Sequence, residues 1–183
     1  MITQEIKISI NGLEQSEARH LINSILEIFT IFTYLDLRRF RLLIVTDKFE
    51  KEIQKLSLEK KLIMKNKFLQ NNNTHAVVLT FKNENDFESV LILKSSFAIN
   101  LIKNEKNPIR YKDAIHIVHH ELAHIHDNNK KIDAKNRFNT RKNPKKDNLF
   151  LVLSQLCWSE YIANYLSSSS ASKSLMPELV ANF

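Results

Sequence analysis

The N-terminal part of the chain shows the spacings of apolar residues that are typical of one strand and one long helix. Apolar and polar residues alternate from Ile6 to Ile10, which predicts a half-buried strand that ends at Asn11-Gly12. From Gln15 to about Tyr34 the apolar residues recur at helical spacing, and Ser16 is the expected N-cap of that helix.

The middle of the chain predicts a second helix and three further strands. The apolar run Phe40–Thr46 is strand-like, and the charged segment from Lys48 to about Phe68 has the spaced apolar residues of a surface helix. His75–Phe81 and Ser89–Lys94 have the composition of strands, and the polar residues 83–86 between them indicate a hairpin turn.

The C-terminal part predicts two helices on either side of a basic segment. One helix is expected from about Tyr111 to His126, and a polar, basic stretch follows from Asp127 to Asp147. A final long helix is expected to start near Asn148 and to run into the serines at 167–170. Because strands come first and helices last, we expect an α+β fold with one small mixed or antiparallel sheet.

The length and composition are those of one globular domain. A chain of 183 residues has room for a single domain with a real core, which we expect to span residues 1–183. The sheet would occupy residues 1–110 and the C-terminal helices residues 111–170, with the basic insert at 127–147. One glycine in the whole chain excludes the glycine-rich loops that bind phosphates and dinucleotides.

The sequence gives no sign of secretion or of a membrane anchor. The single cysteine, Cys157, cannot form an internal disulfide, and the N-terminus lacks a basic start followed by an apolar run. The most apolar stretch, residues 21–37, is interrupted by Asn23, Glu27 and Asp36. We therefore expect a cytoplasmic protein without a membrane partner.

The net charge of +7 allows two interpretations. A basic surface can attract nucleic acid, whereas lysines scattered over solvated faces have no specific partner. The charges do not form one long stripe on one helix, so nucleic acid is a possible partner that the pattern does not favour. The densest basic run, from Lys130 to Lys146, is either a solvated loop, a lid over a site or a contact for an acidic partner.

The segment with the clearest chemistry is His120-Glu121-Leu122-Ala123-His124. Its two histidines are four residues apart, so on a helix both imidazoles point from one face and can bind one Zn²⁺ at about 2.0–2.1 Å. Glu121 lies off that face, where it can take a proton from a metal-bound water and pass it to a leaving amine. The surrounding uncharged residues predict a buried helix, in which these polar groups need a partner.

A catalytic zinc site needs a third protein ligand. No glycine follows His124, which excludes the variants whose third ligand comes after a glycine turn. Glu160 is the expected ligand, because it is a lone carboxylate in the otherwise apolar helix 149–166. Three weaker rivals lie in polar or terminal segments: Asp133, Asp147 and Glu178.

These motifs, with Trp158-Ser159-Glu160-Tyr161-Ile162-Ala163-Asn164, resemble the gluzincin branch of the zincin-fold metallopeptidases. The likeness covers the C-terminal third of the chain and is closest to small bacterial and prophage-encoded members. It implies a zincin-like fold with a substrate-binding edge strand, here at about Ser89 to Ser96. It also implies that a residue four positions after the glutamate supports a ligand histidine, and this position holds Asn164.

Several other side chains could contribute to such a site. His116, His119 and His126 lie close to the motif in sequence, and we expect them to be spectators, with His126 and Asp127 at the end of the helix. Cys157 is expected in the core. The group that stabilises the transition state is left open among three tyrosines, Tyr111, Tyr161 and Tyr165.

The function predicted from the sequence is zinc-dependent hydrolysis of peptide bonds in a peptide or protein substrate. His120, His124 and Glu160 would hold the metal, and Glu121 would be the general base. One alternative is a non-catalytic zinc-binding or degenerate peptidase module, with His116 or His126 as a fourth ligand. Another is a regulator that binds nucleic acid through the basic insert. The pattern selects neither a particular substrate nor an oligomeric state.

Overall fold

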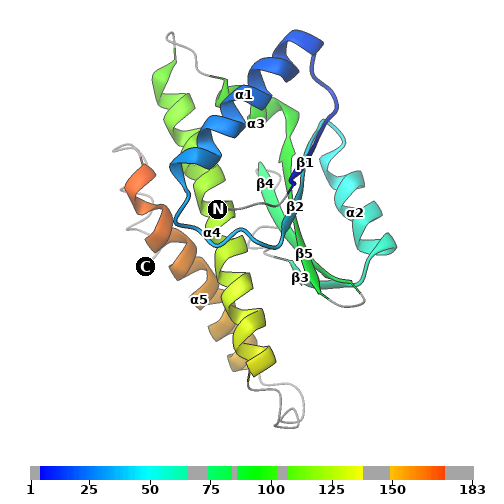
Figure 1. Ribbon diagram of the computed structural model, residues 1–183, viewed down its shortest axis with the longest axis vertical. Coiled ribbons are helices and arrows are strands. Elements are labelled where there is room, and N and C mark those ends of the chain that lie inside the picture. The colour runs from blue at the N-terminus through cyan, green and yellow to red at the C-terminus, as the bar shows by residue number, and fades with distance from the viewer. Residues whose placement is uncertain (1–4, 66–73, 84–85, 103–106, 138–148, 172–183) are drawn as a thin grey trace.

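The computed structural model describes residues 5–65, 74–83, 86–102, 107–137 and 149–171. Within these ranges the chain is a mixed α and β structure built on one mixed sheet with helices on both faces (Figure 1). The fold class predicted from the sequence is confirmed at this level. The strands are β1 (Lys7–Ile10), β2 (Phe40–Thr46), β3 (Leu62–Lys65), β4 (Ala76–Lys82) and β5 (Phe87–Lys94).

The helices that matter for the candidate site are α4 and α5, which lie side by side (Figure 1). The α-helices of the described chain are α1 (Gln15–Ile31), α2 (Phe49–Glu59), α3 (Ser95–Ala98), α4 (Pro108–Arg137) and α5 (Leu149–Ser167). Two short 3₁₀ helices, η1 (Ile99–Leu101) and η2 (Ser168–Ser170), follow α3 and α5. No helix among the described residues combines the length and the apolar character that a membrane crossing requires.

The sheet has the strand order β1-β2-β5-β4-β3. β1, β2 and β5 are parallel, whereas β4 runs antiparallel to both β5 and β3. The hairpin predicted for β4 and β5 is confirmed. The prediction that residues 89–96 form an edge strand is wrong, because β5 is hydrogen-bonded to β2 on one side and to β4 on the other.

Side chains of the central strands alternate between two apolar layers. Val78 and Leu91 pack into the larger layer, beneath α1 and α4, while Val77 and Ile92 pack into a smaller layer beneath α2 (Figure 1). Near-continuous apolar runs in β4 and β5 reflect this burial on both faces. Helix α4 thus packs directly on one face of the sheet, which fixes its position.

Two local predictions about the first half of the chain need correction. The N-cap of α1 is Glu14 rather than Ser16, because Glu17 accepts the backbone N–H of Glu14 at 3.1 Å in a capping box. The helix expected over residues 48–68 ends at Glu59, and Leu62–Lys65 then pairs with β4 as a strand. The short apolar run 62–65 could equally belong to a helix, because its spacing does not show that β4 lies beside it. Pairing with β4 supplies the backbone hydrogen bonds that make it a strand.

Helix α4 begins as expected but ends much later. Asn107 accepts the backbone N–H of Arg110 at 3.4 Å, as an N-cap does, and Pro108 occupies the first helical position. The helix then continues to Arg137, so the predicted insert 127–147 is helical in its first part. Residues 138–148 of the insert lie outside the described chain.

Polar residues in the second half of α4 are held by partners elsewhere in the fold. Asn128 donates to Thr80 on β4 at 3.1 Å, and Asn129 donates to the carbonyl of Asp36 at 2.7 Å. Asp133 pairs with Arg38 and Arg39, which precede β2. These contacts stabilise helical turns that lack an apolar stripe.

Helix α5 is less buried than its apolar sequence predicts. Trp158 is 55% exposed and Tyr165 is 66% exposed, and Cys157 is exposed instead of lying in the core. Ser159, Ala163 and Ser167 are buried on the face toward α4. Because small residues form this contact, α5 can approach α4 closely along one narrow face.

Candidate metal centre

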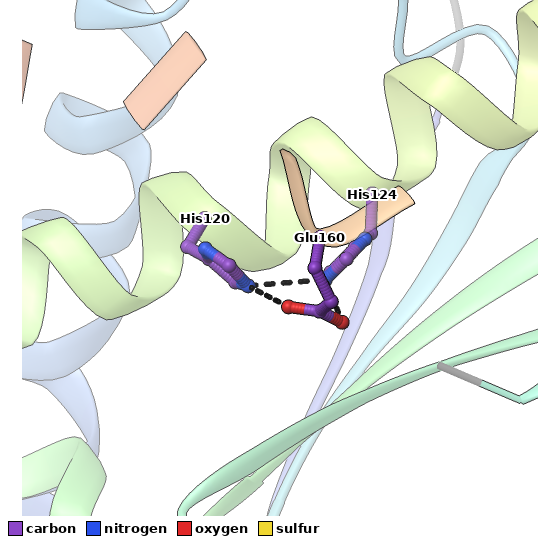
Figure 2. A group of neighbouring side chains, drawn as sticks. All are labelled: His120, His124 and Glu160. Carbon is purple, nitrogen blue, oxygen red and sulfur yellow. Dashed lines mark hydrogen bonds and ion pairs between the residues drawn. The ribbon is translucent and has the colours of Figure 1, made fainter. Parts of the chain in front are cut away.

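The two histidines of the motif project from the same face of α4, one turn apart (Figure 2). The side chain of His124 is 2% exposed and that of His120 is 18% exposed. Their Nε2 atoms lie 3.0 Å apart. Two imidazole nitrogens at this distance need a proton or a cation between them, since two lone pairs repel.

Glu160 on α5 completes the group. Its Oε2 lies 3.4 Å from the Nε2 of His120, and its Oε1 lies 3.4 Å from the Nε2 of His124 (Figure 2). These three are the only side chains among the described residues whose ligand atoms gather in this way, all within 4.8 Å of one another. The structure therefore brings together the three side chains that the sequence predicts as metal ligands.

The spacing of the three groups fits a tetrahedral ion. Ligand bonds of about 2.0–2.1 Å at tetrahedral angles place neighbouring ligand atoms about 3.3 Å apart. The separations of 3.0 and 3.4 Å are close to this value, with each histidine nitrogen 3.4 Å from a different oxygen of Glu160. Two imidazoles and one carboxylate are also a donor set that zinc uses in catalytic sites.

Without a metal, protons balance the charge of the group. Burial alone would lower the pKa of His120, but hydrogen bonding to Glu160 and the charges of Glu121 and Glu160 raise it overall. Burial would raise the pKa of Glu160, but its hydrogen bonds to the two histidines lower it to about 2. The group thus attracts positive charge, as a metal site does.

Glu121 lies next to this group but is not part of it. Its Oε2 is buried and has no hydrogen-bond partner among the described residues. The carboxylate accepts a hydrogen bond from the backbone of Val78 on β4, yet burial raises the pKa of Glu121 above its ordinary value. A buried carboxylate with a raised pKa and an unpaired oxygen is well suited to take up a proton.

Asn164 lies one turn after Glu160 on α5. Its side chain hydrogen-bonds His120, which contributes to the raised pKa of that histidine. The position that the family resemblance marks as a support for a ligand histidine therefore does contact one. An amide oxygen accepts an imidazole N–H without adding a charge.

The remaining histidines of α4 are held by partners outside the group. The Nδ1 of His116 lies 3.2 Å from the carbonyl of Ser167, and burial lowers the pKa of His116. His126 is not at the helix end; its Nδ1 accepts the backbone N–H of Asp36 at 2.8 Å. Neither is a fourth ligand in this arrangement.

His119 connects α4 to η2 and to the segment that follows α1. Its Nε2 lies 2.5 Å from the hydroxyl of Tyr34 and its Nδ1 lies 2.8 Å from the hydroxyl of Ser170, while its ring stacks on Phe32. His119 is fully buried, and burial together with the neighbouring histidines lowers its pKa to about 4.

We expect His119 to make the stability of the metal-free protein depend on pH. Its pKa is about 4 in the folded state and 6.5 in the unfolded chain, so only the unfolded chain binds a proton between these values. Stability should therefore fall as the pH drops from 6.5 toward 4, by about 3 kcal/mol at most. Urea unfolding in the presence of a chelator would measure this slope.

The variant His119→Gln serves as the comparison for that slope. It retains a hydrogen-bonding side chain but has no proton to gain in this range. All other titrating groups are shared, so the wild-type slope should exceed that of the variant. Equal slopes would contradict a neutral, buried His119.

The other side chains considered as contributors to the site lie elsewhere or outside the described residues. Asp133 is engaged by Arg38 and Arg39, and Asp147 and Glu178 are not described. Tyr161 is 48% exposed on α5, and Tyr165 is more exposed still. Tyr111 is part of the first turn of α4, and burial raises its pKa.

The described start of the basic run is neutralised by acidic partners. Lys130 lies 3.5 Å from Asp36, and Lys131 lies 2.5 Å from Asp127. These two lysines therefore do not form a cationic patch. Lys135 and Arg137 also lie on α4, and the four remaining basic residues of the run, at 141–146, lie outside the described chain.

Two buried residues behind His124, Ser159 and Asp127, were not predicted as parts of the site. The hydroxyl of Ser159 contacts His124 and Asp127. Asp127 follows His124 by three positions, a helical spacing that could have marked it as a neighbour of the ligand. Ser159 gives no such signal, because it comes from α5 and only the packing of the two helices brings it there.

Comparisons of the chain with models of protein families, with curated proteins and with solved structures found no significant match.

Proposed function

We propose that this chain is a zinc-dependent metallopeptidase of the zincin fold and the gluzincin type. The observation that carries this proposal is the convergence of two imidazole nitrogens and one carboxylate at 3.0–3.4 Å beside the unpaired, buried oxygen of Glu121. In this proposal His120, His124 and Glu160 hold Zn²⁺ and Glu121 is the general base.

The donor set supports zinc over the harder cations. Magnesium and calcium take six or more oxygen ligands, whereas this group offers two nitrogens and a carboxylate. When bound, zinc would polarise a substrate carbonyl and bring the pKa of a coordinated water near 7. Three protein ligands leave one position of a tetrahedral ion open for that chemistry.

Glu121 performs the proton transfers in this scheme. Its unpaired Oε2 accepts a proton from the attacking water, and the carboxylic acid then donates the proton to the leaving amine of the cleaved peptide bond. The raised pKa of Glu121 favours the first of these transfers, because a higher pKa makes the carboxylate a stronger base toward water. Hydrogen bonding to Val78 fixes the carboxylate against the sheet.

The contacts of the neighbouring residues argue against the alternatives considered for the sequence. A closed structural zinc site would use a fourth ligand, but among the described residues neither His116 nor His126 joins the group of His120, His124 and Glu160. A nucleic-acid interface would present free cations, but the first two lysines of the basic run, Lys130 and Lys131, pair with carboxylates.

Metal removal tests the proposal directly. Purified protein loaded with zinc should contain one zinc per chain by elemental analysis and should cleave bonds in a mixed peptide library analysed by mass spectrometry. Chelation should abolish cleavage, and added zinc, but not magnesium, should restore it. Protein that takes up no zinc from a metal-replete buffer would rule out the proposed site.

A further inference from the structure

The ring nitrogen of His124 that faces away from the candidate metal position leads to a buried polar chain. Its Nδ1 lies 3.2 Å from the hydroxyl of Ser159, and that hydroxyl donates to Oδ2 of Asp127 at 3.1 Å. All three residues are buried, with Asp127 5% and Ser159 7% exposed. These hydrogen bonds thus lead from His124 on α4 to Ser159 on α5 and back to Asp127 on α4.

Counting hydrogens fixes the direction of this chain. A serine hydroxyl has one hydrogen, and Ser159 donates it to Asp127, whose ionised carboxylate can only accept. The oxygen of Ser159 must therefore accept from His124, so the hydrogen of the neutral imidazole is on Nδ1. In the neutral imidazole that binds a metal, Nε2 is then the unprotonated nitrogen, and it is Nε2 that faces His120 and Glu160. A hydrogen that Nε2 shares with Glu160 in the metal-free group leaves when the metal binds.

We propose that Asp127, acting through Ser159, is a positioning residue that selects the metal-binding tautomer of His124. This inference rests on the proposed metal site. A carboxylate at the end of the chain makes Ser159 a better acceptor and makes Nε2 a stronger ligand, as carboxylates behind metal-bound histidines do. Lys131 pairs with the same buried carboxylate at 2.5 Å and supplies the opposite charge.

The hydrogen bonds from His124 to Ser159 and Asp127 also connect the two helices of the site, α4 and α5. Ser159 directly precedes Glu160, so its hydrogen bonds hold α5 against α4 at the point from which the third ligand projects. Each ligand histidine then has its own support, since Asn164 contacts His120 while Asp127 acts on His124. Asp127, which supports His124, lies on α4, the helix that also carries both ligand histidines.

Zinc affinity, measured by competition with a chromophoric chelator, tests this role. Ser159→Ala and Asp127→Ala should each weaken zinc binding by about 10–100-fold, the range for a lost support of a ligand. The double variant should be no weaker than the worse single variant, because both changes break one chain. Asp127→Asn retains an acceptor oxygen and should lose less affinity than Asp127→Ala.

Asn128→Ala is the matched control on the same helix. Asn128 is buried and bonds Thr80, but it does not contact the polar chain behind His124. It should lower the free energy of unfolding and leave zinc affinity close to that of the wild type. Nitrogen-15 spectra of the histidine rings in metal-free protein, recorded at a pH where the rings are neutral, give a second readout: His124 should carry its hydrogen on Nδ1 in the wild type and shift toward Nε2 in Asp127→Ala.

The outcomes separate this inference from the proposed function. Wild-type protein that binds no zinc would overturn the proposed metal site. The tautomer of His124 would still test whether Asp127 acts on His124 through Ser159. Zinc binding by wild type with unchanged affinity in Ser159→Ala and Asp127→Ala would overturn the positioning role alone. Equal losses in these variants and in Asn128→Ala would show that helix packing, and not the chain, sets the affinity.

Discussion

Replacing Glu121 by Gln is expected to lower the rate of peptide hydrolysis by about 10²–10⁴-fold while zinc stays bound. The amide has the size of the carboxylate but cannot take a proton from water. Glu121 contributes no atom to the group of ligand atoms around His120, so metal affinity should change little. Steady-state cleavage of a peptide found with the wild type, together with zinc content, would measure both effects.

Glu88→Gln is a suitable control for the Glu121 variant. Glu88 is a carboxylate on β5 that pairs with Lys60, on the part of the sheet covered by α2. Its replacement removes a charge of the same sign and should leave the turnover number unchanged. Full activity in Glu121→Gln would eliminate the general-base role, and loss of zinc in this variant would show that Glu121 acts on the metal site itself.

Replacing Glu160 by Ala should abolish tight zinc binding. It removes one of three protein ligands, so the loss should exceed the roughly 10–100-fold expected for a supporting residue. In metal-free protein the change also removes the negative partner of His120, so the pKa of His120 should fall. Chelator competition would measure the affinity, and histidine resonances followed over pH would measure the pKa.

Two further variants on α5 separate the loss of a ligand in Glu160→Ala from a general effect on the helix. Glu160→Gln retains the side-chain shape but loses the charge, so it should bind zinc weakly as well. Gln155→Ala alters an exposed residue of the same helix and should leave the affinity unchanged. Tight zinc binding in Glu160→Ala would show that the third ligand is another residue.

The contacts that position the site could be predicted only in part. His120, Glu121 and His124 are adjacent in sequence, and helical geometry alone places the two imidazoles together. Glu160 could be anticipated because a lone carboxylate in an apolar helix needs a partner. The spacing of Asp127 from His124 could mark it as a neighbour of the ligand, but no local signal marks Ser159, because its contact with both depends on the rotation of α5 against α4.

Solvent exposure is where local patterns were most misleading. The apolar composition of α5 predicts burial on all sides, yet Trp158 and Tyr165 are exposed and only a narrow face of small residues meets α4. The polar composition of residues 127–147 predicts an insert between the two helices. In its described part, however, Asn128 bonds Thr80 on β4 and Asp133 pairs with Arg39 before β2, and the helix continues to Arg137. In both cases the deciding contacts join segments far apart in the chain.

The elements that could be predicted from the sequence are those whose information is local. Alternating and helical periodicities located β2, β4, β5 and α1, and the motif located two ligand positions and the neighbouring base, because these depend on spacing within one segment. The tertiary structure alone decided that β5 is a central strand, that β3 pairs with β4, and that Glu160 faces His120 and His124 at 3.4 Å. These features depend on hydrogen bonds and packing between distant segments, and the energy of such contacts is not encoded in the spacing of residues along either segment.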